Sequence, residues 1–395
     1  MKKILTNGKI ITENDVICGY DLVIENEKIA KIIPHIPVTD DNYLEDCNGA
    51  YILPGLIDMH SDMIENLIQP RSTALFDIEF GIVEAERILV MSGITTMFHS
   101  VSMYQEGKWD TKKIRQAKMV QQLMEKIKEH QQHGAMIHNR FHLRYEIDNV
   151  ACYEQVKSML KDHAVDLFSI MDHSPGQGQY RNLSVYRKHM PGEGKNLTDE
   201  EFAEHIRKEN EKEKLTEKQI EELVLLAQSQ NIAVASHDDE SVEKIKLNQK
   251  RGVNISEFPI TIETASEAVK YGQLTVLGAP NVLLGGSHSG NLSAEEAVRK
   301  GVASILVSDY YPQALIHSIF ELWRKKVLSL PDAVRLCTIN PAKATKMDGE
   351  RGSLKVGKYA DIIVVDYNGQ DRPFIRKVYA NGTKVMDCQR RTEHE

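Results

Sequence analysis

The sequence predicts an α/β fold: a (β/α)8 TIM-type barrel with a small β-sandwich formed by the two chain ends. Three features of the sequence predict it. Short apolar runs recur through the middle of the chain, with helical sequence between most of them. Most of these runs end in His, Asp or Glu, and the functional groups of such barrels gather at the carboxyl ends of the strands. The chain ends, in contrast, consist of short strands and turns.

The two ends of the chain have matching patterns. Residues 1–53 contain short apolar segments separated by turns, and residues 350–395 contain a longer apolar run followed by the hairpin turn Asn381-Gly382. Because these β-rich ends flank a long alternating middle, we expect them to pair into one sandwich beside a barrel of residues 54–349.

The middle of the chain contains eight strand candidates. A regular alternation of strands and helices predicts a parallel sheet, and eight strands predict a closed barrel. The strands are expected to end at or near His60, His99, Glu146, His173, His237, Pro259, Gly286 and Asp309.

The longest interruption of this pattern, residues 174–223, follows the fourth strand candidate. It contains two capping-box starts, Thr198–Glu201 and Thr216–Gln219, so we expect charged helices there. Long insertions in compact domains are often functional, which favours a lid over the carboxyl face of the barrel. The alternative is a solvated helical hairpin with no role in the site.

The composition excludes several other classes of protein. A net charge of −8, from 49 basic and 57 acidic residues, argues against a general nucleic-acid binder. The five cysteines are scattered and form no C-x-x-C pair, so neither a disulfide framework nor a cysteine zinc site is expected. No apolar run reaches the length of a membrane span, and the first one is too short for a signal peptide. We therefore expect a cytoplasmic enzyme with no membrane or nucleic-acid partner.

His60 and Asp62 are the most informative pair, because they lie two positions apart after an apolar run. In a strand, residues i and i+2 point to the same face, so both side chains can reach one metal ion. Taken singly, each histidine is more easily an ordinary one; the repetition at successive strand ends is what indicates a metal site. The predicted metal ligands are His60, Asp62, Glu146, His173, His237 and Asp309.

This ligand set would hold one or two divalent ions. Its carboxylates suit Mn²⁺ or Mg²⁺ as well as Zn²⁺. The sequence leaves open whether Glu146, His142 or Glu257 completes the set.

Residues 140–146 alternate polar and apolar side chains. In a barrel strand one parity faces the interior, and the other packs on the helices. The polar parity consists of Arg140, His142, Arg144 and Glu146. If it is interior, it offers a carboxylate to a metal and arginines to an anion. An internal Arg–Glu salt bridge is the alternative for Arg140.

Residues 285–291 form a second candidate anion site. Their glycines let the backbone approach a ligand closely, and a helix is expected to start just beyond them, at Ser293. Charged residues in the insertion would add to this site, although a plain turn and a solvated face are the alternatives. The predicted substrate-binding residues are Arg140, Arg144, Arg181, Lys188, Ser287 and His288.

Several of these segments resemble the amidohydrolase superfamily. Residues 53–60 are similar to its first-strand motif, and residues 340–344 and 352–366 are similar to its return into the β-sandwich. Asp62 stands where that motif usually has a second histidine. One branch of the superfamily shares this departure, the α-D-ribose 1-methylphosphonate 5-triphosphate diphosphatases of the carbon–phosphorus lyase pathway. Further segments that resemble this branch are 171–177, 235–239, 278–281, 285–291 and 308–312.

The resemblance implies a metal-dependent hydrolase that releases diphosphate from a phosphorylated sugar phosphonate, in a chain that associates with itself as a dimer. A divalent metal lowers the pKa of a bound water from about 16 to about 7. We expect the resulting hydroxide to attack the α-phosphorus, with Asp309 accepting its proton. The alternative is hydrolysis of an amide or amine C–N bond by a cyclic amidase, deacetylase or deaminase. A non-catalytic scaffold of the same fold is a further alternative.

Overall fold

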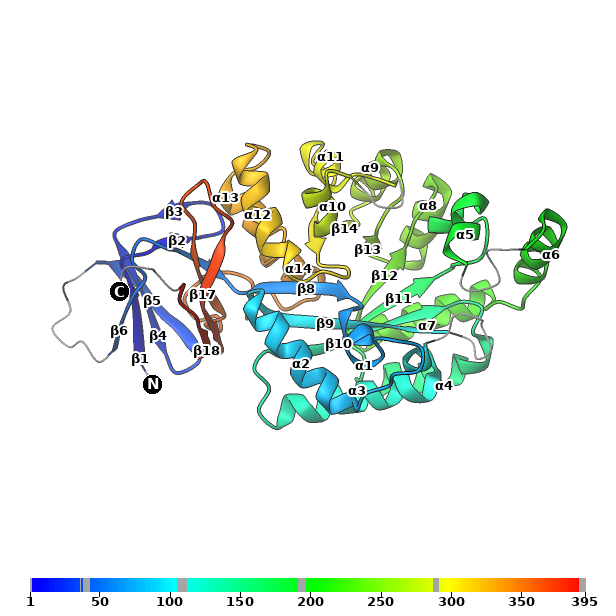
Figure 1. Cartoon of the computed structure of the whole chain (residues 1–395), viewed down its shortest axis with the longest axis horizontal. Coiled ribbons are helices and arrows are strands. Elements are labelled where there is room, and N and C mark those ends of the chain that lie inside the picture. The colour runs from blue at the N-terminus through cyan, green and yellow to red at the C-terminus, as the bar shows by residue number, and fades with distance from the viewer. Residues whose placement is uncertain are drawn as a thin grey trace.

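The computed structural model describes residues 2–35, 37, 43–104, 112–190, 197–286 and 291–390, without the side chains of Gln179, Val185 and His189. Its strands form three sheets. One is an eight-stranded parallel sheet, and the other two lie together at one end of the molecule (Figure 1). The first and last strands of the chain both belong to these two smaller sheets.

The eight-stranded sheet is the barrel. Its strands follow one another in chain order, and each is parallel to the next. They are β8 (Leu56–Ser61), β9 (Ile94–Met103), β10 (His138–Glu146), β11 (Leu167–Met171), β12 (Ala233–His237), β13 (Ile255–Glu257), β14 (Leu274–Gly278) and β15 (Ile305–Val307). The predicted (β/α)8 barrel is confirmed.

The barrel closes between its first and last strands. Ser61 and Asp309 form a parallel bridge just beyond β15. The Asp309 amide donates to the His60 carbonyl at 2.9 Å, and the Asp62 amide donates to the Asp309 carbonyl at 2.9 Å. The closing hydrogen bonds are therefore made by the backbone of three predicted site residues.

Helices cover the outside of the barrel. Phe141, Leu143 and Tyr145 face outward from β10 into a buried apolar cluster with α3 (Ala117–Gln132) and α4 (Tyr153–Lys161), as the alternation of residues 140–146 predicts. The helices are α1 (Met63–Ile68), α2 (Ile78–Met91), α3 (Ala117–Gln132), α4 (Tyr153–Lys161), α7 (Glu217–Ser229), α8 (Val242–Arg251), α9 (Ile262–Lys270), α10 (Ala279–Leu284), α11 (Ala294–Arg299), α12 (Ala314–Arg324), α13 (Leu330–Arg335) and α14 (Ile339–Ala344).

Two strand ends differ from the expectation. The seventh strand ends at Gly278, not at Gly286, and residues 281–284 lie in α10. Pro280 stands in the first turn of that helix, where its fixed φ fits and its missing N–H costs nothing. A short apolar run alone does not separate a strand from a buried helix. The second strand continues past His99, whose Nε2 lies 2.9 Å from the Asn139 Oδ1 on the neighbouring strand.

The two chain ends build the sandwich. An antiparallel pair, β7 (Tyr51–Pro54) with β16 (Ile362–Asp366), joins them within one sheet. That sheet contains β18 (Thr383–Asp387), β17 (Phe374–Ala380), β16 (Ile362–Asp366), β7 (Tyr51–Pro54), β2 (Lys9–Ile11) and β3 (Val16–Ile17). The other sheet contains β5 (Lys28–Pro34), β4 (Tyr20–Glu25), β1 (Lys2–Thr6) and β6 (Leu44–Asp46). Side chains from both sheets, among them Leu22 and Val364, share one buried core.

The passage from sandwich to barrel occurs at Gly55, between β7 and β8. A side chain at this position would collide with Thr95 on β9, so the close approach of residue 55 to β9 requires glycine. The strand β8 then runs away from the sandwich (Figure 1). The carboxyl ends of the barrel strands thus face the opposite end of the molecule.

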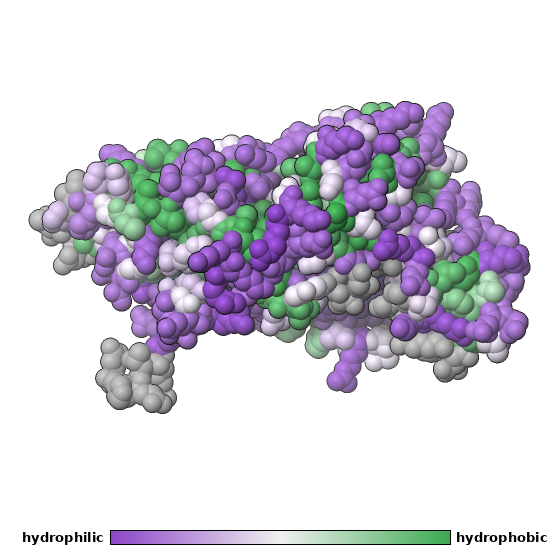
Figure 2. Space-filling model, turned by 90° about the horizontal axis from the view of Figure 1, so that it is seen from above, coloured by the Kyte–Doolittle hydropathy of each residue, from purple (hydrophilic) through white to green (hydrophobic). Residues whose placement is uncertain are grey.

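The insertion lies at that opposite end. Its helices are α5 (Leu183–His189) and α6 (Asp199–Asn210), and α6 has no buried residue (Figure 1). Both predicted capping boxes are present, at Thr198 and at Thr216, the second of which begins the barrel helix α7. No helix within the described ranges is long and apolar enough to cross a membrane. Seen from above, the surface is mainly hydrophilic, with separate apolar groups (Figure 2).

Candidate functional site

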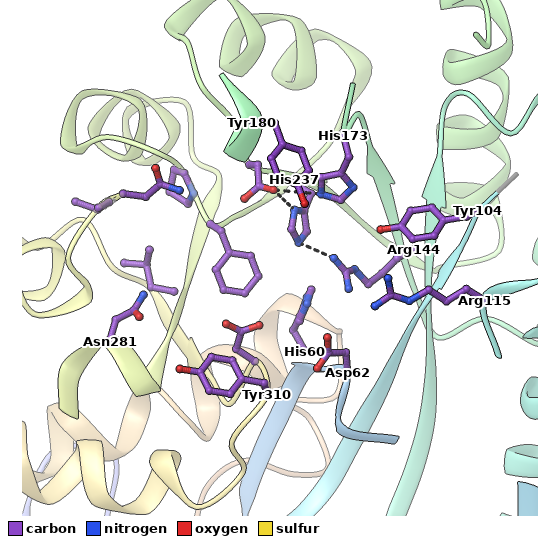
Figure 3. Close-up of a pocket in the computed structure, with 17 residues that line it drawn as sticks. His60, Asp62, Tyr104, Arg115, Arg144, His173, Tyr180, His237, Asn281 and Tyr310 are labelled. Atoms are coloured by element: carbon purple, nitrogen blue, oxygen red, sulfur yellow. Dashed lines mark hydrogen bonds and ion pairs between the residues drawn. The ribbon is translucent and has the colours of Figure 1, made fainter. Parts of the chain in front are cut away.

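A pocket of about 310 Å³ lies at the carboxyl ends of the barrel strands (Figure 3). Imidazoles, carboxylates and guanidinium groups line it together with a partly apolar wall. The predicted site residues that the structure brings together here are His60, Asp62, Arg144, His173, His237 and Asp309. Further lining residues, none of them among the predicted site residues, include Tyr104, Arg115, Tyr180, Asp238, Phe258 and Tyr310.

A hydrogen-bonded group of side chains supports the pocket from below, and we call His142, Ser169 and Glu257 the floor cluster. The Ser169 hydroxyl donates to the Glu257 Oε2 at 2.6 Å and lies 2.6 Å from the His142 Nε2. The His142 Nδ1 lies 3.0 Å from the Met59 carbonyl, so both ring nitrogens have partners. Burial lowers the pKa of His142 to about 3, which keeps this ring neutral.

His60 connects the floor cluster to the pocket. Its Nδ1 lies 3.0 Å from the Glu257 Oε1, which leaves the Nε2 as the nitrogen that can serve a ligand. Burial also lowers the pKa of His60, to about 4. A metal ligand must be a neutral imidazole, and the orientation fixed by a carboxylate behind the ring is typical of metal-bound histidines.

A second group, which we call the mouth cluster, consists of His173, His237 and Asp238. The Asp238 Oδ2 lies 2.9 Å from the His237 Nδ1 and 3.4 Å from the His173 Nε2. All three atoms are buried, and none has a partner in hydrogen-bond geometry among the described residues. Buried polar atoms without partners are costly unless something else binds them.

The mouth cluster depends on a local change of backbone direction. His237 is the last residue of β12, and adjacent residues in a strand point to opposite faces. Asp238 does not follow this alternation, because its φ is 51°, in the left-handed region. Its side chain therefore also faces the pocket. Phe258 and Asp309 have the same conformation at the ends of β13 and β15, with φ of 53° and 61°. Strained residues of this kind cluster at functional sites.

Glu146 lies behind the mouth cluster. Its carboxylate is hydrogen-bonded to the His173 Nδ1, and it also accepts from the His173 amide at 3.3 Å. Burial alone would lower the pKa of His173, but the charge of Glu146 raises it overall. The structure therefore places Glu146 as the residue that orients His173, not among the residues that line the pocket.

The mouth cluster and its neighbours fit a divalent cation. Two groups of buried side chains have ligand atoms within 4.8 Å of one another: His60 with His142 and Glu257, and the mouth cluster itself. The atoms of the first group are largely engaged in hydrogen bonds, whereas those of the second are not. Imidazole and carboxylate donors with unmet bonding capacity are what Zn²⁺ or Mn²⁺ requires. The cation would therefore contact the mouth cluster.

Asp62 and Asp309 add two carboxylates beside His60. The Asp62 Oδ1 is buried and has no hydrogen-bond partner within the described part of the chain. Burial, and then the charge of Asp62, raise the pKa of Asp309 to about 7. A carboxyl group poised near neutrality can accept or donate a proton under ordinary conditions.

Two guanidinium groups, those of Arg115 and Arg144, line the pocket (Figure 3). Arg144 comes from β10, as predicted, and its Nη2 donates to the His237 Nε2 at 3.2 Å. Arg115 comes from a single 3₁₀ turn (Lys113–Arg115) between β9 and α3. No pattern of the sequence indicated Arg115, because it does not stand at the end of a strand or in a regular repeat.

Of the other predicted substrate-binding residues, the three that the structure describes do not line the pocket. Arg140 lies towards the amino end of β10, where its Nη1 donates to the Asp166 Oδ1 at 3.1 Å. Arg140 therefore forms an ion pair, with an aspartate instead of the glutamate considered above. Arg181 and Lys188 are exposed on the insertion and do not contribute to the lining. Ser287 and His288 lie outside the described residues.

The fold and the pocket together define a hydrolase of one family. The chain belongs to the amidohydrolase family, whose model matches residues 51–385. It is 32% identical to the α-D-ribose 1-methylphosphonate 5-triphosphate diphosphatase of Escherichia coli strain K12, over 97% of this chain and all of that protein. It is 25% identical to the dihydroorotase of Aquifex aeolicus, over 93% of this chain and 90% of that one.

Solved structures show the same fold. The dihydropyrimidinase from Brevibacillus agri superposes with a TM-score of 0.66 at 15% identity, over 98% of this chain and 95% of that chain. The N-acetylglucosamine-6-phosphate deacetylase from Pasteurella multocida gives a TM-score of 0.64 at 14% identity, over 97% and 99%. At these identities the likeness concerns the fold alone.

Proposed function

We propose that this protein hydrolyses α-D-ribose 1-methylphosphonate 5-triphosphate and releases diphosphate. One observation carries the proposal: buried imidazoles and carboxylates share a pocket with two guanidinium groups, Arg115 and Arg144. A neutral amide needs no such cations, whereas a phosphate chain does. The relative from Escherichia coli, similar along the whole chain, supports the same substrate.

The proposed metal ligands hold one or two divalent ions and position the reacting water. When bound, such an ion lowers the pKa of a water and offsets the charge of the phosphates. Glu257 and Glu146 orient two of the ligands, His60 and His173, from behind. The ligands that we propose are His60, Asp62, His173, His237, Asp238 and Asp309.

Asp309 is the proposed general base. It accepts a proton from the attacking water, and the water oxygen forms a bond to the α-phosphorus. The bond that breaks joins the α-phosphorus to the oxygen leading to the β-phosphorus, and diphosphate leaves with that electron pair. The products are diphosphate and ribose 1-methylphosphonate 5-phosphate. The raised pKa of Asp309, about 7, suits a base that works near neutral pH.

Phosphorus NMR of the metal-loaded protein with ribose 1-methylphosphonate 5-triphosphate tests the proposal. The expected result is the appearance of diphosphate together with a sugar 5-phosphate resonance. Release of a single phosphate would move the attack to another phosphorus. An unchanged spectrum, with metal shown to be bound, would overturn the proposed substrate.

Hydrolysis of a cyclic amide is the second candidate function. The dihydroorotase relative covers nearly the whole chain, which is the observation that favours it. Incubation with dihydroorotate and with a hydantoin, followed by ultraviolet absorbance, separates the two candidates. We expect no turnover of either compound, and turnover that disappears in the Asp309→Asn variant would favour this alternative.

A further inference from the structure

Arg115 is fixed in place by contacts on the side away from the pocket. Its Nε donates to the Glu65 Oε2 at 2.7 Å, and Glu65 is fully buried on α1. Its guanidinium carbon also lies 5.2 Å from the centroid of the Tyr104 ring. A guanidinium group carries five N–H donors, and these contacts use only the one on Nε. Both Nη groups have no hydrogen-bond partner among the described residues.

Arg144 is a buried cation without a paired carboxylate. The residue is 8% exposed, and no described carboxylate oxygen lies within 4.0 Å of its guanidinium nitrogens. Its Nε is buried without a hydrogen-bond partner in the described part of the chain. Burying a charge in this way is costly unless an anion binds to it. Arg144 therefore points to a ligand with negative charge.

The two arginines follow one another along the same wall of the pocket. Figure 3 shows Arg144 beside His237 and Arg115 beyond it, next to Tyr104. On the other side of His60 and Asp62 lie Asn281 and Tyr310. The cations thus lie across His60 and Asp62 from Asn281 and Tyr310. The pocket lining also includes the apolar side chains of Phe258, Leu277 and Leu292.

We propose that Arg115 and Arg144 form one anion subsite that binds the terminal diphosphate portion of a phosphate chain. Arg144 lies near the reacting phosphorus, because it contacts the mouth cluster, and Arg115 binds the outer phosphates. The organic part of the substrate then lies against the wall with Asn281 and Tyr310. The orientation of the phosphate chain rests on the proposed function, but the binding of an anion by Arg115 does not.

The arrangement explains how a highly charged ligand enters a pocket that contains several carboxylates. Asp62, Asp238 and Asp309 all line it, so phosphates placed at random would meet like charges. The planar guanidinium fork matches phosphate oxygens in a way that a lysine ammonium does not. In the proposed reaction the same two groups also stabilise the negative charge that develops on the departing diphosphate.

Binding of inorganic tripolyphosphate to the metal-loaded protein tests the subsite, by calorimetry in buffer with metal in excess over the ligand. We expect Arg115→Met to weaken binding roughly 10- to 100-fold, as the loss of charge-assisted hydrogen bonds implies. Arg140→Gln is the matched control, since it removes one arginine far from the pocket, and should bind like the unaltered protein. Tripolyphosphate that fails to bind the unaltered protein would overturn the subsite.

Arg115→Lys guards against a variant that does not fold. It keeps a positive charge beside the buried Glu65 but loses the planar fork, so it should fold and bind tripolyphosphate with intermediate strength. If both Arg115 variants fold and bind as tightly as the unaltered protein, Arg115 is only a structural partner of Glu65 and the inference is wrong.

The subsite and the proposed function fail in distinguishable ways. If binding depends on Arg115 but the sugar triphosphate releases no diphosphate, the subsite stands and the assigned reaction falls. If diphosphate is released and kcat/KM is unchanged in Arg115→Met, the reaction stands and the subsite falls. If the subsite and the reaction are both correct, Arg115→Met should lower kcat/KM for the sugar triphosphate.

Discussion

The floor cluster and the mouth cluster have similar composition but opposite hydrogen bonding. Each contains buried histidine and a carboxylate whose ligand atoms come close together. In the floor cluster, Ser169 links His142 to Glu257, and every one of these groups has a partner. In the mouth cluster, the converging atoms of His237 and Asp238 have none in hydrogen-bond geometry within the described ranges. Satisfied hydrogen bonds thus make the floor cluster a structural support, and the absence of such bonds makes the mouth cluster the proposed ligand site.

The largest effect is expected at the mouth of the barrel, in Asp309→Asn. The amide cannot accept the proton of the attacking water, so turnover should fall by at least about 100-fold. The fold should persist, because the closing hydrogen bonds at residue 309 are made by the backbone. The diphosphate assay measures the first effect and circular dichroism the second. A folded variant with a near-normal rate would remove Asp309 from its proposed role.

Metal removal should separate the two clusters by their effect on stability. A cation held at 100 times its Kd adds about 2.7 kcal/mol to the free energy of unfolding, so a chelator should lower the Tm. His237→Ala should abolish this shift, because the ligand is lost. Glu257→Gln should start from a lower Tm and keep part of the shift, because the mouth cluster remains while His60 loses the residue that orients it. Scanning calorimetry with and without chelator gives both values, and a full shift in His237→Ala would contradict the assignment.

The pH dependence of the metal-free protein should have opposite signs in the two clusters. Burial lowers the pKa of His142 from 6.5 to about 3, so the unfolded chain binds the proton more readily. Stability from His142 is therefore lost as the pH falls from about 6.5 towards 3, by at most about 5 kcal/mol.

For His173 the sign is reversed, because Glu146 raises its pKa against the effect of burial. The stability that His173 contributes is complete at a pH below the pKa of this residue in the unfolded chain. It is lost as the pH rises through the pKa of His173 in the folded protein. Urea unfolding of chelated protein across this range, with His142→Gln and Glu146→Gln, separates the two slopes. Equal slopes in both variants would show that neither histidine behaves as described.

Metal affinity should depend on the protonation of His173. A cation must displace it, so affinity should fall as the pH decreases. Glu146→Gln should flatten this dependence and also weaken binding by roughly 10- to 100-fold, since a residue that orients a ligand is lost. Metal titration monitored by calorimetry at several pH values measures both. A Glu146→Gln variant with unchanged affinity and unchanged pH dependence would argue against its orienting role.

The smallest effect is expected at Arg140, which belongs to neither cluster. Its ion pair with Asp166 is partly exposed, with 41% and 32% of the side chains accessible. Pairs of this kind contribute about 0–1 kcal/mol, so Arg140→Gln should unfold at nearly the same urea concentration and retain full activity. A large loss of activity in this variant would indicate that Arg140 takes part in substrate binding.

The sequence predicts which face of a strand a side chain occupies better than it predicts how far along the barrel axis that side chain lies. Arg140 and Arg144 share one parity, and both were expected in the site. Only Arg144 stands at the carboxyl end, four residues further along β10. Glu146 has the correct parity as well, but its partner His173 lies between it and the pocket. Periodicity fixes direction, whereas depth depends on how neighbouring strands are staggered.

Two site residues could not be predicted by these rules. Asp238 follows His237 directly, and strict alternation points it away from the pocket; only its left-handed backbone brings it back. Arg115 reaches the site from an irregular connection, held there by Glu65. Both placements arise from tertiary contacts and local backbone geometry. The barrel itself, by contrast, follows from repeated apolar runs that each meet the same local rule.

The junction between the first and last barrel strands determines when the site can form during synthesis and folding. Asp309 hydrogen-bonds through its backbone to His60 and Asp62, so the site unites segments separated by almost 250 residues of chain. Contacts between such distant segments form late, because the intervening chain must first be ordered. A growing chain on the ribosome therefore carries its first two site residues long before their partner is made. Activity of this protein would report that synthesis and folding are both complete.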